Sequence, residues 1–248
     1  MRSGTLIAQV TDCHLKADAQ QLYRGINPYE NLKMLLNKVK RIKPDLLLAS
    51  GDLSEDGDRA AYAALQHLFK SLGIPVLALP GNHDDAEQLA ETFPGSPVDS
   101  VEVTAHGPWQ IIRLNSSLPG KTEGRLSEKV LLELESLLAN QPQCPRLIAV
   151  HHQPIIVGSP WIDKYRLFDA QRFLQLIDQY PDIKAVVWGH IHQVFETDRN
   201  GTAMLGGPSS ATNSLPGVQN FTADSSGPAC RWLELLADGT IRYGIISV

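Results

Sequence analysis

The chain has 248 residues and carries 22 Lys and Arg against 27 Asp and Glu, a formal net charge of −5. Such a mildly acidic chain lacks the basic field that polyanion binding requires, so we expect no nucleic-acid partner. With 43% hydrophobic and 20% charged residues, the composition is typical of a globular protein and excludes a disordered one.

The sequence gives no sign of a membrane span, a secretory leader or a thiolate centre. No window approaches the roughly 18 continuous apolar residues that a span needs. The first residues lack the apolar core and cleavage site of a signal peptide. Cys13, Cys144 and Cys230 are scattered and without CxxC spacing, which argues against a disulfide framework and a zinc–thiolate site. We therefore expect a cytoplasmic protein without a membrane partner, either a monomer or a homodimer.

Short apolar runs alternate with helical patterns along the chain. In chain order, the pattern predicts a strand at 5–10, a helix at 28–42, a strand at 45–50, a helix at 60–72, a strand at 74–79, a helix at 84–93, two strands within 101–114, a helix at 127–139, a strand at 146–150, a helix at 169–180 and a strand at 183–188. The first helix is the best marked, with Asn27 as N-cap, Pro28 at the first position and Glu30 in the capping-box place. Asp169 is the expected N-cap of the last helix.

The last quarter of the chain differs in character. Residues 206–227, from Gly206 to Gly227, are rich in Gly, Pro and Ser and are expected to form an irregular loop. This loop could line a substrate pocket, form a dimer contact or be a plain connection. It leads into a hairpin that turns at Asp238-Gly239. We predict one α/β domain over residues 1–248, parallel at first and more antiparallel at its end.

Polar residues of the metal-ligand type follow five of the predicted strands directly. The five segments are Asp12-Cys13-His14, Gly51-Asp52, Gly81-Asn82-His83-Asp84, His151-His152 and Gly189-His190-Ile191-His192. Ligands in open α/β sheets bind beyond the carboxyl ends of the strands, so we expect the five strand ends to converge. The pairs Asp12/His14 and His190/His192 are two residues apart, which points both members to the same side of an extended chain.

The residue types in this set predict a two-metal site. They offer imidazoles, carboxylates and one amide oxygen, which suit Zn, Fe or Mn better than the all-oxygen cage of Ca. Seven ligands are too many for one ion, and two ions that share a bridging carboxylate form a clamp for displacement at phosphorus. The glycines at 51, 81 and 189 are expected to let the backbone turn tightly where each strand ends.

These five segments, in this order, resemble the complete signature of the calcineurin-like metallophosphoesterase family over residues 6 to 192. In finer detail the chain is similar to the bacterial class III cyclic-nucleotide phosphodiesterases, through its DCHL, HHQP and GHIHQ segments, Gly124-x-Leu126-Ser127 and the ADGT hairpin. The resemblance implies a four-layer α-β-β-α sandwich, in which two mixed β-sheets are flanked by helices.

The resemblance also implies which residues hold each ion. One metal would be held by Asp12, His14, Asp52 and His192. The second would be held by Asp52, Asn82, His151 and His190, with Asp52 as the bridge. In relatives with an HHxP segment the first histidine is the ligand, so we choose His151 and keep His152 as the alternative. Fe and Mn are the expected metals, and Zn also fits the ligand set.

The activity implied is hydrolysis of 3′,5′-cyclic nucleotides, cAMP to 5′-AMP, by in-line attack of a hydroxide that bridges the two metals. Asp52 and His83 are the expected catalytic residues, since an unliganded imidazole can protonate the departing ribose oxygen. The expected substrate-binding residues are His14, Asp52, Asn82, His83 and His192. The alternative is the same chemistry on another small phosphodiester or monoester, such as a 2′,3′-cyclic nucleotide or a glycerophosphodiester. A scaffold role without catalysis predicts a lost ligand, and none is lost here.

Some neighbouring residues have two interpretations. Asp84 either orients His83 or is an exposed residue at the start of a helix. Arg24 could overhang the cleft, although a surface position is favoured. Cys13 is expected to be a buried, inert thiol. The tryptophans that we expect in the core, and not against a base, are Trp161, Trp188 and Trp232.

Overall fold

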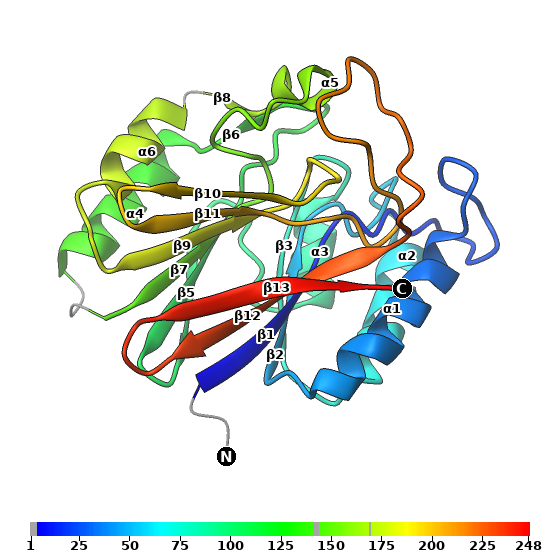
Figure 1. Cartoon of the computed structure of the whole chain (residues 1–248), viewed down its shortest axis with the longest axis horizontal. Coiled ribbons are helices and arrows are strands. Elements are labelled where there is room, and N and C mark those ends of the chain that lie inside the picture. The colour runs from blue at the N-terminus through cyan, green and yellow to red at the C-terminus, as the bar shows by residue number, and fades with distance from the viewer. Residues whose placement is uncertain (1–3, 141–143, 169) are drawn as a thin grey trace.

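The computed structural model describes residues 4–140, 144–168 and 170–248. Two β-sheets pack face to face, and helices cover both outer faces (Figure 1). The order of layers is therefore helix, sheet, sheet, helix, which confirms the expected fold class.

The first sheet is mixed and has the strand order β13-β12-β1-β2-β3. Its parallel strands are β1 (Gly4–Val10), β2 (Leu46–Ser50) and β3 (Val76–Leu79). The antiparallel strands are β12 (Ala229–Leu236) and β13 (Ile241–Ser247), joined by the predicted turn at 238–239. The helices on its outer face are α1 (Pro28–Ile42), α2 (Arg59–Lys70) and α3 (Ala86–Thr92).

The second sheet has the order β10-β11-β9-β7-β5-β4. Its strands are β4 (Val101–His106), β5 (Trp109–Leu114), β7 (Arg146–Ala149), β9 (Ile183–Trp188), β10 (Phe195–Arg199) and β11 (Thr202–Gly206). Its helices are α4 (Glu128–Asn140) and α6 (Ala170–Ile177). The remaining short elements are β6 (Gly124–Arg125), β8 (Leu167–Phe168) and α5 (Pro160–Asp163). Of all these, β6, β8, β10, β11 and α5 were not predicted from the sequence.

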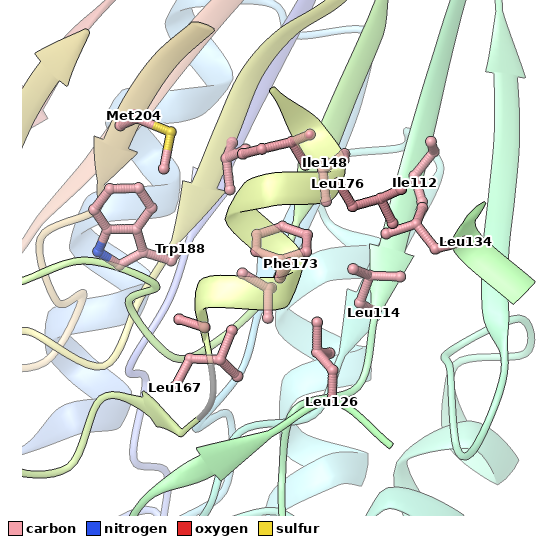
Figure 2. Packing of buried hydrophobic residues seen from close by; sticks show 14 of the residues in the cluster. Ile112, Leu114, Leu126, Leu134, Ile148, Leu167, Phe173, Leu176, Trp188 and Met204 are labelled. Carbon is pink, nitrogen blue, oxygen red and sulfur yellow. The ribbon is translucent and has the colours of Figure 1, made fainter. Parts of the chain in front are cut away.

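The core lies in the three interfaces between the four layers. Between the sheets, apolar side chains of β1, β2 and β3 meet those of β5, β7 and β9. Figure 2 shows the outer interface of the second sheet, where Phe173 and Leu176 of α6 lie over Ile112, Leu114 and Ile148. Truncating a fully buried side chain such as Phe173 to Ala typically costs about 3–5 kcal/mol. This packing fixes the strands whose ends carry the polar segments.

Local signals place several element ends correctly. Helix α1 spans the predicted residues, and the Glu30 N–H donates to Asn27 Oδ1 at 3.0 Å. Helix α3 is shorter than predicted, because Asp85 and not Asp84 is its N-cap. The predicted N-cap Asp169 lies outside the described residues. Within the described ranges, no helix is both long and apolar enough to cross a lipid bilayer.

Candidate metal centre

The ends of five strands, three from one sheet and two from the other, meet at one edge of the sandwich. Backbone bonds tie the loops of the first sheet together, with Asp12 N–H donating to Gly51 O and His14 N–H to Asp52 O, both at 2.9 Å. The His190 N–H, from the second sheet, donates to both carboxylate oxygens of Asp12 at 3.0 Å. The predicted site residues are therefore brought together as expected.

The backbone at this edge adopts a conformation that side chains normally avoid. Of the eight non-glycine residues with positive φ in the described chain, five belong to the predicted ligand set: Asp12 (52°), His14 (47°), Asp52 (50°), His190 (66°) and His192 (48°). Each such residue costs on the order of 1–3 kcal/mol unless its surroundings enforce it, and residues of this kind gather at functional sites. The strained backbone therefore indicates a candidate functional site at this edge.

The glycines of these segments are required for two different reasons. Gly51 has a φ of +94° and so makes the tight turn that was expected. At Gly81 the reason is space, since a Cβ there would lie 2.2 Å from Asp52 Oδ1. At Gly189 a Cβ would lie 1.9 Å from Thr11 Oγ1. The turn-based expectation is thus correct for Gly51, whereas close approach explains Gly81 and Gly189.

Three histidines present the same ring nitrogen to the centre of the site. The Nδ1 atom of His14 lies 2.6 Å from Glu55 Oε2, that of His192 lies 2.8 Å from Thr212 O, and that of His151 lies 2.9 Å from Ser50 O. All three acceptors are oxygens, so hydrogen-bonding assigns the ring proton to Nδ1. The Nε2 atoms then carry lone pairs. In metal sites, oxygen acceptors that hold the other ring nitrogen orient the ligating histidines in this way.

The lone pairs face one another and two carboxylates. His14 Nε2 lies 3.1 Å from His192 Nε2, and His192 Nε2 lies 3.4 Å from Asp12 Oδ1. His151 Nε2 lies 3.3 Å from Asp52 Oδ2. Electron pairs at such distances repel unless protons or cations lie between them. The donor set therefore fits cations held between these atoms.

Two buried atoms in the site lack hydrogen-bond partners. Among the residues that the structure describes, Asn82 Oδ1 and His151 Nε2 are both in this condition. Buried polar atoms are nearly always paired, so each such exception calls for an explanation. His190 Nε2 lies 3.2 Å from Tyr165 O, which leaves its Nδ1 as the atom available for a ligand. An amide oxygen and imidazole nitrogens are suitable ligands for Mn, Fe or Zn.

The structure distinguishes the neighbouring histidines His151 and His152. Their ligand atoms cluster with that of His190, so proximity alone does not choose between them. Both ring nitrogens of His152 are committed, with Nδ1 at 2.7 Å from Ser116 Oγ and Nε2 at 3.1 Å from Thr122 O. A Cβ on Gly124 would lie 2.3 Å from the His152 ring. This geometry favours His151 as the ligand and His152 as a buried structural residue.

Burial keeps most of these imidazoles neutral. It lowers the pKa of His192 to about 4 and that of His152 to about 3, and it lowers the pKa of His14 and His190 as well. Burial also acts on His151, but the adjacent Asp52 carboxylate outweighs it and raises the His151 pKa to about 9. Metal ligation requires neutral imidazoles. Most of the set therefore needs no deprotonation before it can bind an ion.

The comparisons with known proteins agree with this geometry. The family model described as calcineurin-like phosphoesterase matches residues 5–194. The chain belongs to this family. It is 39% identical over 236 residues to the "3′,5′-cyclic-nucleotide phosphodiesterase alr5338" of Nostoc sp., covering 94% of this chain and 89% of the relative. It is 33% identical over 248 residues to the "3′,5′-cyclic adenosine monophosphate phosphodiesterase CpdA" of Pseudomonas aeruginosa, covering 99% of this chain and 91% of the relative.

A solved structure shares the phosphoesterase fold. A dimetal phosphatase from Danio rerio superposes with a TM-score of 0.71, covering 99% of each chain at 13% sequence identity. At this identity the likeness concerns the fold alone. It matches the four-layer arrangement described above.

Of the histidines that line the phosphoesterase cleft, His83 is the one that was not predicted to be a metal ligand. His83 lines a cavity of about 240 Å³ together with His14, Asp52 and Asn82. Its side chain is 37% exposed, and its Nδ1 lies 2.9 Å from the backbone oxygen of Glu55 and 3.4 Å from Glu55 Oε2. The Glu55 side chain was not singled out from the sequence. The only signal was an acidic residue three positions after Asp52, in the same loop.

Both interpretations of Asp84 were wrong. Its carboxylate accepts hydrogen bonds from the backbone N–H groups of Leu53, Ser54 and Gly81 and from the Tyr62 hydroxyl. It therefore joins two of the ligand loops, and the His83 ring is held by Glu55 instead. Most of the donors come from another loop or from α2, which is why the sequence neighbourhood of Asp84 was misleading.

Three further expectations can be compared with the phosphoesterase cleft. Cys13 is buried beside Ser210 Oγ at 3.1 Å, and burial raises the pKa of its thiol, as expected of an inert cysteine. Arg24 is exposed, in agreement with the favoured surface position, and it also lines the cavity. Trp188 is fully buried, whereas Trp161 packs against the core and also lines the cavity.

Proposed function

We propose that the chain is a metal-dependent phosphodiesterase that hydrolyses 3′,5′-cyclic nucleotides, with cAMP converted to 5′-AMP. The observation that carries the proposal is the convergence of His Nε2 atoms and carboxylate oxygens beside a cavity that His83 also lines. The names of the two relatives described above support the choice of substrate.

The proposed ligands divide into two sets that share one residue. The first set is Asp12, His14, Asp52 and His192, and the second is Asp52, Asn82, His151 and His190. Support comes from short distances: ligand atoms of Asp12, His14 and His192 in the first set lie within 4.8 Å of one another, as do those of His151 and His190 in the second. The ligand atoms of Asp12, Asp52 and His151 also lie within 4.8 Å of one another, which brings the two sets together. Two metal ions held there supply an activated water nucleophile and neutralise negative charge on the phosphate. Fe and Mn are the proposed metals, with Zn also compatible.

His83 is proposed as the general acid. Its backbone N–H donates to Asp52 Oδ1 at 2.9 Å, which fixes the residue beside the carboxylate that the two ligand sets would share. Its ring nitrogen Nδ1 is engaged by Glu55, so Nε2 is the atom available to give a proton to the departing ribose oxygen. The charges of Asp52 and Glu55 outweigh the effect of burial and raise the pKa of His83, which favours the protonated form that this role needs.

Glu55 is proposed as a positioning residue for the metal ligand His14 and for the general acid His83. One carboxylate oxygen faces the Nδ1 atoms of His14 and His83 together. A carboxylate that accepts from a ligating histidine fixes its tautomer and raises the basicity of its other nitrogen. Orientation of the metal ligand and of the acid therefore depends on the same side chain.

Replacing the proposed bridge tests the function. Asp52→Ala is expected to reduce bound metal to below two ions per chain, as measured by elemental analysis, and to abolish turnover of cAMP. Asp58→Ala is the matched control, because Asp58 lies on the same loop and its side chain makes no capping hydrogen bond to α2. Full activity of Asp52→Ala would contradict the two-metal proposal. Parallel assays on 2′,3′-cAMP, glycerophosphodiesters and AMP separate the proposed substrate from the alternatives.

A further inference from the structure

The loop between β11 and β12, residues 207–228, is braced at its base and extends toward α5 (Figure 1). Asn213 Oδ1 accepts from the Ser209 N–H at 2.8 Å, and Asn213 Nδ2 donates to Gly227 O at 2.9 Å. Leu215 N–H donates to Thr222 O at 2.8 Å, which joins the two limbs of the loop. Residues 216–221 then form its tip. The Gly-, Pro- and Ser-rich loop is therefore held in one conformation by hydrogen bonds within it.

The tip lies against the cavity that His83 and the proposed ligand His192 line. Three consecutive residues, Gln219, Asn220 and Phe221, line it opposite the histidines. The Phe221 ring centroid lies 5.9 Å from that of His192 and 5.3 Å from that of Trp161. The loop thus supplies one wall of the cleft, made of two amides and an aromatic ring.

Planar side chains from the segment after β1 lie next to this wall, and one of them contacts Phe221. The Tyr23 ring stacks on the His14 imidazole, with centroids 4.2 Å apart and 9° between the planes. Arg24 Nε donates to the Tyr23 hydroxyl at 2.9 Å, and the Arg24 guanidinium lies 4.0 Å from the Phe221 ring centroid. Guanidinium and aromatic planes are the surfaces on which proteins stack nucleobases.

A different chemistry surrounds His83 in a second cavity that it also lines. This cavity has a volume of about 490 Å³ and is lined by the carboxylates of Asp56, Asp85 and Glu87. Among its described lining residues there is no Phe, Tyr or Trp. A flat, apolar-faced ring attached to a phosphate ester beside His83 is therefore better accommodated on the side of Phe221.

We propose that Gln219, Asn220 and Phe221, together with Arg24, form a nucleobase-binding subsite. The base stacks against the Arg24–Phe221 pair, and the two amides hydrogen-bond to its polar edge. A primary amide offers a donor and an acceptor side by side, which complements the N6 and N7 atoms of adenine. The inference rests on the proposed function, because it assigns the base end of the same substrate.

Binding of the product tests the subsite without turnover. Calorimetry on the Mn-loaded protein compares 5′-AMP with ribose 5-phosphate, which has the same phosphate and sugar but no base. We expect 5′-AMP to bind at least tenfold more tightly than ribose 5-phosphate. Asn220→Ala and Phe221→Leu are each expected to lower this affinity ratio about tenfold. Val218→Ala, on the same tip but outside the cavity lining, is the control and leaves the ratio unchanged. Equal affinities for the two ligands in the unaltered protein would overturn the subsite.

A turnover measurement separates the subsite from the proposed reaction. The ratio of kcat/KM for cAMP to kcat/KM for bis(p-nitrophenyl) phosphate is expected to fall about tenfold in Asn220→Ala. A ratio that stays constant overturns the subsite but leaves the phosphodiesterase proposal intact. Conversely, the unaltered protein could show no diesterase activity and still bind 5′-AMP more tightly than ribose 5-phosphate. That result overturns the proposed reaction and supports the subsite.

Discussion

Replacing Glu55 by Gln isolates the contribution of one carboxylate charge to the site. Glu55 Oε2 lies 2.6 Å from His14 Nδ1 and 3.4 Å from His83 Nδ1, and the side chain is only 18% exposed. Burial opposes ionisation of this carboxyl, but the hydrogen bond from His14 and the charges of His14, His83 and Lys16 together outweigh burial and lower the Glu55 pKa. The wild-type acceptor is therefore a carboxylate, whereas the amide in the variant is neutral and nearly the same size.

The expected magnitude follows from the change in hydrogen-bond type. A hydrogen bond to a charged group contributes about 1.5–3 kcal/mol and a neutral one about 0.5–1.5 kcal/mol, so the variant loses on the order of 1.5 kcal/mol at His14. This corresponds to about a tenfold loss of metal affinity, at the lower end of the 10- to 100-fold effects typical of such partners. The loss is expected at the site that contains His14, and not at the site that contains His151.

Metal titration with a competing chelator measures the two affinities, and kcat is measured at saturating metal. Glu55→Gln is expected to weaken one site about tenfold and, through the loosened His83 ring, to lower kcat when both sites are filled. Asp56→Asn is the matched control, since the neighbouring Asp56 is 55% exposed and pairs with Lys16 at 2.9 Å. If both sites keep wild-type affinity and kcat is unchanged in Glu55→Gln, the positioning role of Glu55 is refuted.

Three further predictions concern His83, the pair His151 and His152, and the cysteines. His83→Ala is expected to lower kcat by about 10²–10⁴-fold while elemental analysis still finds two ions per chain; loss of an ion would place His83 among the ligands. His151→Ala is expected to lose one ion, whereas His152→Ala is expected to keep both and to lower the free energy of unfolding by about 3 kcal/mol in denaturant titration; the reverse pattern would exchange their roles. Cys13 and Cys230 are fully buried and burial raises their thiol pKa values, so at most one thiol per native chain should react rapidly with Ellman's reagent, and three after denaturation. Rapid reaction of all three native thiols would contradict the burial.

Local chemistry made much of the fold predictable. The start of helix α1 was predicted to the residue because its cap and first-turn proline act within a few positions of the chain. The β12–β13 hairpin was predicted from Asp238-Gly239 for the same reason. The buried strands were found as apolar runs, since both of their faces are covered in a four-layer structure.

The elements that were missed depend on distant contacts or on exposed faces. Strand β10 (Phe195–Arg199) is mostly exposed and polar, so its sequence lacks an apolar run. The Asn200-Gly201 pair, a strong hairpin signal, could have indicated the β10–β11 turn. Strands β6 and β8 have two residues each and pair with one another across about forty positions, a contact that local patterns do not encode.

The same division applies to the candidate site. The strand-end ligands could be predicted because parallel strands deliver their carboxyl ends to one edge. The acceptors that orient the rings, such as Thr212 O and Ser50 O, could not, because backbone oxygens carry no sequence signature. The role of Asp84 was missed for a related reason, since its partners are N–H groups of another loop. The contact of residues 219–221 with the cavity could not be predicted, because the path of their loop depends on contacts with distant parts of the chain.

The central claim is that these residues form a metal-dependent cyclic-nucleotide phosphodiesterase. The most direct test strips the protein of metal, reconstitutes it with Fe, Mn or Zn in turn, and follows conversion of cAMP to 5′-AMP by chromatography. We expect no turnover by the stripped protein and recovery with at least one metal as occupancy approaches two ions per chain. Failure on cAMP with every metal, alongside efficient hydrolysis of another ester, would contradict the substrate, and undiminished turnover after stripping would contradict the metal centre itself.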